Sequence, residues 1–199
     1  FLYALQVARH FLNAGSRTTA LVIGAEKLSS LVNWEDRNTC VLFGDGAGAV
    51  VIRAVDADTD SPGRVLSTVM GSDGTLSDLL KVPGGGSALP ITPENAASRP
   101  NTIHMEGRET FKHAVTRFPE VIGEALQATN KTVADIDMLI PHQANLRISQ
   151  FVQAKLGLPD HKVFNNIQKY GNTTAASIPI ALCEAWETFL GSAQPASKA

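Results

Sequence analysis

Two polar side chains, His142 and Asn172, occupy similar places in the sequence. Each follows a short predicted strand and precedes a predicted helix, in the segments Pro-His-Gln-Ala-Asn and Tyr-Gly-Asn-Thr-Thr. Open α/β sheets place their ligands where strands end and helices begin. A neutral imidazole N–H and an amide N–H both donate, so together they could hold the oxygen of an enolate formed from a thioester or ketone. The sequence alone leaves a second interpretation open, in which both residues only cap helices.

The other chemically suggestive motifs are weaker. His10 and His113 fall within predicted helices and His161 in a turn, which favours surface or structural roles. The segment Gly-Asp-Gly-Ala-Gly at 44–48 has the glycine spacing of a nucleotide-binding loop. A β-branched run follows it, however, where such a loop needs a helix. We interpret this segment as a tight turn between two buried strands.

Hydrophobic periodicity predicts strands and helices that alternate along the chain. Gly15 and Gly157 stand where helix C-termini are expected, and Pro119 marks a kink or a new first turn in a helical face. Residues 71–100 read as a long surface loop. The alternation indicates a layered α/β fold. The predicted strands are 19–24, 38–44, 49–55, 65–69, 136–140 and a short one near 163, and the predicted helices are 1–14, 111–126, 146–156 and 174–190.

The composition is that of a globular chain and argues against several classes of protein. Of the 199 residues 44% are hydrophobic and the net charge is −2, which is unlike a disordered protein. No apolar run approaches the ~18 residues that a membrane-spanning helix needs. The absence of a Lys/Arg-rich block argues against nucleic-acid binding. Two cysteines without metal-ligand spacing predict no metal site and favour a cytoplasmic protein with reduced thiols.

Four motifs make the sequence similar to the β-ketoacyl-acyl-carrier-protein synthase III family, which belongs to the thiolase-like superfamily of condensing enzymes. They are Pro-His-Gln-Ala-Asn-Leu-Arg-Ile at 141–148, Tyr-Gly-Asn-Thr-Thr-Ala-Ala-Ser at 170–177, Phe-Gly-Asp-Gly-Ala-Gly-Ala at 43–49 and Asp-Arg-Asn-Thr at 36–39. The resemblance runs from Phe1 to about Trp186. It implies a thiolase-like αβαβα layered fold of two similar halves, present here incompletely, and a homodimer. Residues 1–72 would be the remainder of the N-terminal half and residues 73–199 the truncated C-terminal half.

The resemblance also implies an acyltransferase with a Cys-His-Asn active site and no cofactor besides its substrates, a coenzyme A thioester and malonyl-acyl carrier protein. The cysteine would take the acyl group, and His142 and Asn172 would stabilise the enolate that forms when the malonyl group loses carbon dioxide. Attack of the enolate on the acyl-cysteine would give 3-oxoacyl-acyl carrier protein, the step that initiates fatty-acid synthesis. By position Arg37 matches the arginine beside the coenzyme A adenine, and Lys112 and Arg147 match contacts to the acidic carrier protein, although by themselves all three would be surface charges. Five further matches line the pantetheine and acyl tunnel: Met105, Gly107, Phe111, Ala144 and Asn145.

The nucleophilic cysteine that the resemblance implies would stand three residues before the position of Phe1, outside this sequence. The chain opens inside a helix without a capping residue, and an unpatterned tail from Gly191 stands where the family has further strands. We therefore expect a chain truncated at both ends, inactive by itself and of poor stability in isolation. Cys40 and Cys183 are predicted to be core residues. Two alternatives remain open: a related condensing enzyme or acyltransferase of secondary metabolism, and a non-catalytic truncated subunit.

Overall fold

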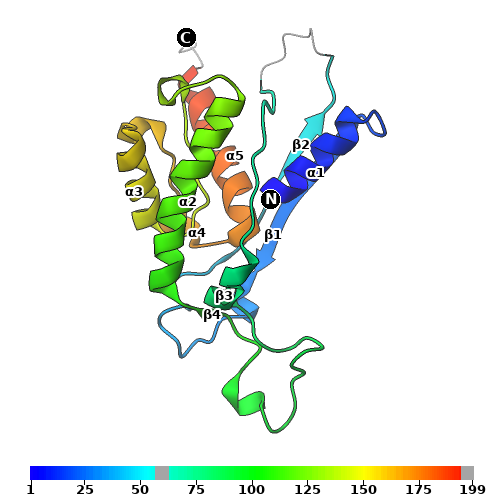
Figure 1. Ribbon diagram of the computed structural model, residues 1–199, viewed down its shortest axis with the longest axis vertical. Coiled ribbons are helices and arrows are strands. Elements are labelled where there is room, and N and C mark those ends of the chain that lie inside the picture. Colours follow the sequence, from blue (N-terminus) through cyan, green and yellow to red (C-terminus); the bar gives the residue numbers. More distant parts are fainter. Residues whose placement is uncertain (57–62, 194–199) are drawn as a thin grey trace, which may run out of the picture.

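The computed structural model describes residues 1–56 and 63–193, and its centre is a two-stranded ribbon with helices packed against it (Figure 1). Strands β1 (Thr19–Lys27) and β2 (Asp45–Arg53) pair antiparallel along their whole length. Helix α1 (Leu2–Asn13) contacts β1, and helix α5 (Ser177–Ala193) contacts both strands. Helices and ribbon therefore form layers, as the alternating sequence pattern predicted.

A second group of elements forms the other part of the molecule. Helix α2 (Gly107–Ala128) packs against helix α3 (Leu146–Leu156), and the two lie side by side in Figure 1. The segment between β2 and α2 contains a short antiparallel pair, β3 (Leu80–Lys81) with β4 (His104–Met105). The short helices are η1 (Leu28–Ser30), η2 (Gly74–Leu79), η3 (Ala96–Ser98), η4 (Val133–Asp135), η5 (Asp160–Lys162), α4 (Ile167–Tyr170) and η6 (Thr174–Ala176).

Local signals set the bounds of α1 and α3 well, whereas α2 begins four residues before its predicted start and α5 three residues after its predicted start. The predicted bounds of α3 are confirmed, because the Asn145 side chain accepts the backbone N–H of Arg147 at 2.9 Å and Gly157 ends the helix at a φ of 69°. Helix α2 continues through Pro119 instead of starting anew there. Helix α5 extends beyond its predicted end to Ala193, and the rest of the predicted tail lies outside the described residues.

Four strand predictions were wrong. Residues 38–44 form turns, with one isolated bridge at Phe43, and residues 65–69 join no sheet. The predicted strands at 136–140 and 163 are reduced to one parallel bridge between Leu139 and Val163. In each case an apolar run of strand-forming residues finds no partner strand among the described residues long enough to build a ladder. A strand requires such a partner, because its hydrogen bonds are made to another segment.

The glycine-rich segment at 44–48 is not a turn but runs into β2, whose first residue is Asp45. Its glycines let the chain around residues 170–180 approach the ribbon closely. A Cβ atom on Gly44 would lie 2.0 Å from the carbonyl oxygen of Tyr170, and one on Gly48 would lie 3.0 Å from the backbone nitrogen of Ile180. These glycines therefore serve packing against the segment that carries Asn172.

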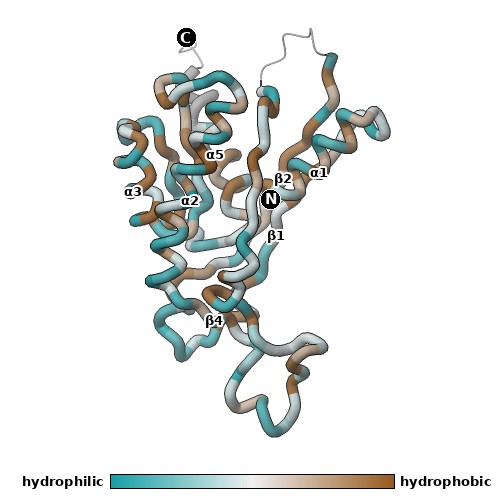
Figure 2. The backbone as a smooth tube through the Cα atoms, in the orientation of Figure 1, coloured by the Kyte–Doolittle hydropathy of each residue, from teal (hydrophilic) through white to brown (hydrophobic). Residues whose placement is uncertain are grey.

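The two faces of the ribbon differ in burial. On the face toward η6 and α5, Val22 is 2% exposed, whereas on the opposite face Leu21 and Val51 are 61% and 69% exposed. On that opposite side a groove of about 430 Å³ separates Leu21 and Ile23 from the α1 residues Val7 and Phe11. Figure 2 shows hydrophobic residues along the ribbon. The first strand is thus buried on one face only.

A small hydrophobic cluster of Leu28, Val32 and Ile103 forms a core beneath the ribbon, and Cys40 packs against it as predicted. Cys183 is exposed on α5, so its predicted core position was wrong for this chain. Among the described residues, no helix is both long enough and apolar enough to cross a membrane.

Candidate active site

His142 and Asn172 line one cavity of about 880 Å³. Its walls come from α2, the start of α3, the turn at Leu42 and Phe43, and the segments that carry the two polar residues. Every predicted site residue except Arg37 lines this cavity: Met105, Gly107, Phe111, Lys112, His142, Ala144, Asn145, Arg147 and Asn172. Arg37 is exposed in the adjacent turn, where its neighbour Asn38 reaches the cavity.

His142 stands directly after an extended segment. Leu139 accepts the backbone N–H of Phe164 at 3.0 Å and donates its own to Lys162 at 2.8 Å, which fixes the approach of the chain to the site. Nδ1 of His142 lies 2.6 Å from the hydroxyl oxygen of Ser177. The residue that caps α3 is Asn145, so the interpretation of His142 as a helix cap is rejected.

Burial lowers the pKa of His142 to about 4, with a smaller contribution from the positive α-amino group of Phe1. The cavity wall desolvates the ring and disfavours its charged form. The imidazole is therefore neutral at pH 7, and one of its nitrogens carries a proton while the other accepts.

This depressed pKa predicts a pH-dependent stability. The unfolded chain binds a proton at His142 near pH 6.5 and the folded chain only near pH 4, so the stabilisation is complete above pH 6.5 and is lost as the pH falls toward 4. The wild type should therefore have a lower free energy of unfolding at pH 4 than at pH 7. We expect this difference to be smaller in His142→Gln by on the order of 1–2 kcal/mol. Urea unfolding of both proteins at the two pH values measures this. Parallel pH curves for the two proteins would contradict it.

Asn172 is held by main-chain pairing with the turn before β2. Its N–H donates to the carbonyl of Leu42 at 2.7 Å, and its carbonyl accepts the N–H of Gly44 at 3.0 Å. Its Oδ1 accepts the N–H of Thr174 at 2.9 Å. Because the amide oxygen is engaged in this way, the Nδ2 hydrogens are the polar atoms that Asn172 offers to the cavity. Asn172 follows α4, and not a strand as the sequence predicted.

Glu184 of α5 anchors the helical turn in front of Asn172. Its carboxylate accepts hydrogen bonds from the Tyr170 hydroxyl and, at 3.2 Å, from the Lys169 ammonium group. It also accepts from Asn166 Nδ2 at 3.1 Å. These hydrogen bonds lower the pKa of Glu184, with the Tyr170 hydroxyl as the main cause. The carboxylate thus ties α4 to α5 and limits the movement of Asn172.

Gln143 joins the two parts of the site. Its side-chain Oε1 accepts the backbone N–H groups of Asn166 at 3.0 Å and Ile167 at 3.2 Å, and its Nε2 donates to the carbonyl of Pro141 at 2.8 Å. The side chain is only 3% exposed. The loop that leads to Asn172 is therefore fastened to the segment that carries His142.

We expect Gln143→Leu to destabilise the protein, because it leaves these buried backbone groups without partners. Each unsatisfied group costs about 1–3 kcal/mol, so a total loss of about 2–5 kcal/mol is expected. Thermal unfolding measures the loss. Gln150→Leu on the exposed surface of α3 serves as the control and should change stability little. Equal effects of the two substitutions would show that the Gln143 network contributes nothing.

The rim of the cavity carries basic side chains. Lys112 and Arg147 were predicted there, and Arg108 was missed. Nζ of Lys112 lies 2.6 Å from Glu109 on the same helix, which offsets part of its charge. Lys112 and Arg147 are nevertheless both exposed at the cavity mouth, where an acidic partner could meet them.

Sequence reasoning missed much of the apolar wall. Phe118 lies seven residues after Phe111 on α2, and this helical spacing was a usable signal. For Leu42 and Phe43 no local signal existed, since they reach the cavity by pairing with a segment 130 residues away. The other missed lining residues are Asn38, Leu80, Glu106, Arg108, Thr110, Ala114 and Ile148.

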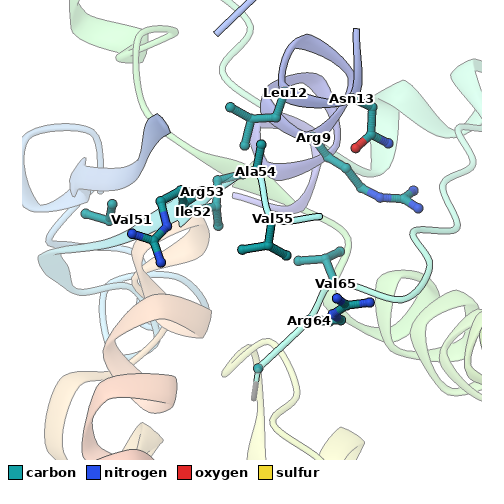
Figure 3. A pocket seen from close by; sticks show the side chains of 11 residues that line it. Arg9, Leu12, Asn13, Val51, Ile52, Arg53, Ala54, Val55, Arg64 and Val65 are labelled. Atoms are coloured by element: carbon teal, nitrogen blue, oxygen red, sulfur yellow. The ribbon is translucent and has the colours of Figure 1, made fainter. Parts of the chain in front are cut away.

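A second cavity, of about 560 Å³, lies between the end of α1, the end of β2 and residues 63–65 (Figure 3). Arg9, Arg53 and Arg64 line it, but in Figure 3 their guanidinium groups point in different directions. Arg9 and Arg64 also donate to main-chain carbonyls, of Leu66 and Asp56. The cavity contains none of the predicted site residues. Within residues 1–56 and 63–193, no group of three or more His, Cys, Asp or Glu side chains could hold a metal ion.

Comparisons with known proteins identify the family of the chain. The profile of 3-oxoacyl-[acyl-carrier-protein] synthase III matches residues 1–74, and the profile of its C-terminal part matches residues 126–194. The chain belongs to the synthase III family. The resemblance carried by the four sequence motifs is thereby confirmed.

Individual relatives agree with this assignment. The chain is 50% identical over 186 residues to the β-ketoacyl-[acyl-carrier-protein] synthase III of Paramagnetospirillum magneticum and 48% identical over 187 residues to that of Natranaerobius thermophilus. These alignments cover 93% and 94% of this chain but 55% and 56% of the relatives. The crystal structure of the Aquifex aeolicus synthase III superposes with a TM-score of 0.82 at 46% identity, over 95% of this chain and 55% of that one. The chain thus has the predicted thiolase-like α/β fold and spans about half the length of the relatives it matches.

Proposed function

We propose that the whole protein is an acyltransferase that condenses an acyl group from acyl-coenzyme A with malonyl-acyl carrier protein, giving 3-oxoacyl-acyl carrier protein. The observation that carries this proposal is the convergence of a neutral imidazole and an oriented amide on one cavity. Two neutral donors suit an oxygen that gains negative charge during the reaction. The family membership of the chain supports the same reaction.

In the proposed reaction, the bond between the carboxylate carbon and C2 of the malonyl group breaks, and carbon dioxide leaves. The electron pair is delocalised between C2 and the thioester oxygen. His142 and Asn172 would donate hydrogen bonds to that oxygen. C2 then attacks the acyl carbon of the acyl-cysteine, a carbon–carbon bond forms, and the cysteine leaves as thiolate.

We propose that the acyl-bearing cysteine stands three residues before the position of Phe1, as the resemblance implies. A thiol near a helix N-terminus is activated by the helix dipole. Neither Cys40 nor Cys183 lines the cavity.

This placement predicts that acetyl-coenzyme A leaves Cys40 and Cys183 unacylated. Cys40 is partly covered by a hydrophobic cluster and Cys183 lies exposed on α5, and neither lines the cavity that contains His142 and Asn172. Intact-mass analysis of the 199-residue chain after incubation should show no stoichiometric adduct. An adduct on either cysteine, located by peptide mapping, would refute the placement.

The remaining assignments follow the geometry of the cavity. We propose that Met105, Gly107, Phe111, Ala144 and Asn145 surround the pantetheine and acyl groups. Lys112 and Arg147 at the rim would receive the acidic carrier protein, and exposed Arg37 would lie beside the adenine of coenzyme A. No cofactor would be required besides the two substrates. We further propose a cytoplasmic homodimer with a boundary between its two structural halves at residues 72 and 73.

The proposed function is tested with the protein that includes the preceding cysteine. Release of carbon dioxide from malonyl-acyl carrier protein and formation of the 3-oxoacyl product are measured with a series of acyl-coenzyme A substrates. We expect both reactions, and a preferred acyl chain would identify the substrate. Acyl transfer without carbon dioxide release would instead support a simple acyltransferase. Absence of both reactions would support a non-catalytic subunit.

A further inference from the structure

The hydroxyl group of Ser177, the first residue of α5, lies 2.6 Å from Nδ1 of His142. Ser177 is only 2% exposed. A hydroxyl carries a single hydrogen and can donate to one acceptor at a time. Two acceptors are within reach of this hydroxyl: Nδ1 of His142, and the carbonyl oxygen of Thr174 at 2.9 Å. The choice between them decides which nitrogen of His142 carries the proton.

The carbonyl of Thr174 already has a donor, because the backbone N–H of Ser177 hydrogen-bonds to it. The 2.6 Å separation from Nδ1 is shorter than the ~2.7–3.2 Å usual when an N–H donates to oxygen, and hydroxyl donors form the shorter hydrogen bonds, ~2.5–3.0 Å to oxygen acceptors. The backbone N–H of Gln143 approaches the hydroxyl oxygen at 3.4 Å and faces its lone pairs. The hydroxyl hydrogen therefore belongs on the line to Nδ1.

We propose that Ser177 is a positioning residue, which donates to Nδ1 of His142 and thereby fixes the tautomer that presents Nε2–H to the cavity. The partner of one imidazole nitrogen commonly determines the protonation of the other in this way. That this N–H then meets an enolate oxygen rests on the proposed function, but the tautomer itself does not.

The same short segment orients the second donor. The N–H of Thr174 holds Oδ1 of Asn172 at 2.9 Å, which turns the amide hydrogens toward the cavity. Thr174 has a φ of 39°, a left-handed conformation that a β-branched residue rarely adopts. The strained turn at Thr174 thus places its N–H toward Asn172 while Ser177, three residues later, engages His142. One segment of six residues, 172–177, therefore orients the donor groups of both His142 and Asn172.

Nuclear magnetic resonance of protein labelled with ¹⁵N-histidine tests the proposal directly. Long-range ¹H–¹⁵N correlations distinguish the two tautomers, and the spectrum of His142→Gln identifies the signals of His142. At pH 7 we expect the wild type to show the Nε2–H pattern, with the Nδ1 signal shifted upfield by the hydroxyl donor. In Ser177→Ala the Nδ1 signal should move downfield and the single-tautomer pattern should be lost. Ser177→Thr, which keeps the hydroxyl, should restore both features.

Ser149→Ala is the matched control. Ser149 is a buried serine of α3, 4% exposed, whose hydroxyl has no hydrogen-bond partner among the described residues, so its removal should leave the His142 signals unchanged. An Nδ1–H pattern in the wild type would overturn the proposal, whether or not Ser177→Ala folds. Unchanged His142 signals in a folded Ser177→Ala would overturn it as well. An Nε2–H pattern in a protein without decarboxylase activity would contradict only the proposed function.

Discussion

His142→Ala and Asn172→Ala are each expected to reduce the release of carbon dioxide from malonyl-acyl carrier protein by about 100- to 1,000-fold, the usual cost of removing one donor from an oxyanion site. Both side chains line the same cavity and present donors in fixed orientations, through Ser177 for His142 and through Thr174 for Asn172. In the proposed reaction the enolate oxygen exists only after the malonyl group begins to decarboxylate. Transfer of the first acyl group to the cysteine should therefore remain largely intact in both variants.

The measurement uses the protein that includes the preceding cysteine. Carbon dioxide release is followed with labelled malonyl-acyl carrier protein, and acylation is followed separately by intact mass. His161→Ala and Asn165→Ala are the controls, because neither residue lines the cavity. The double variant His142→Ala/Asn172→Ala should lose less than the product of the two single effects, since the donors act on one oxygen. Loss of acylation together with decarboxylation would mean that the two residues have a different role.

Gly44→Ala is expected to produce the largest structural effect of any single methyl group considered. The new Cβ would lie 2.0 Å from the carbonyl oxygen of Tyr170 and 3.6 Å from Cγ2 of Thr173. The first separation is far below contact distance and involves backbone, so the chain that carries Asn172 must move away. Overpacking of this kind costs about 1–3 kcal/mol and sometimes more. We expect Gly44→Ala to lower the free energy of unfolding by an amount at the upper end of that range, and also to reduce decarboxylation clearly.

Gly123→Ala is the same chemical change as Gly44→Ala but is expected to raise stability instead of lowering it. Gly123 lies inside α2, and a Cβ atom there meets nothing within 4 Å. Because alanine favours a helix over glycine, this substitution should raise stability by about 0.5–1 kcal/mol. Urea unfolding compares the two variants with the wild type. If Gly44→Ala unfolded at the same urea concentration as the wild type, the close approach of Tyr170 to the ribbon would be refuted.

Nine of the ten predicted site residues line the cavity, for reasons that differ between them. Residues 142–147 follow one another in the chain, and Asn145 caps the helix that follows, so their local order already places them together. Gly107, Phe111 and Lys112 lie on the first turns of α2, where helical spacing brings them to one side. The roles proposed for these residues come from the family motifs. Arg37 is neither close in sequence to the 142–147 segment nor on a helix that lines the cavity, because it lies in a turn.

The strand predictions at 38–44, 65–69 and 136–140 failed because an apolar run shows only that a segment is hydrophobic and favours an extended conformation. Whether it becomes a strand depends on a partner for its N–H and C=O groups. The glycines of 44–48 were misread for the same reason, since their purpose lies in the chain at 170–180 that packs on them. That contact joins segments far apart in the sequence, so no local pattern could predict it.

The sequence by itself determined the helices with strong end signals and the family, and it singled out the two proposed donors. These depend on interactions between residues a few positions apart, or on motifs that can be read along the chain. Only the tertiary structure decided how the donors are oriented. The Ser177 hydroxyl reaches His142 across 35 positions, and Leu42 pairs with Asn172 across 130 positions. Hydrogen bonds between such distant segments form only when the chain folds. They orient the imidazole and the amide toward the same cavity.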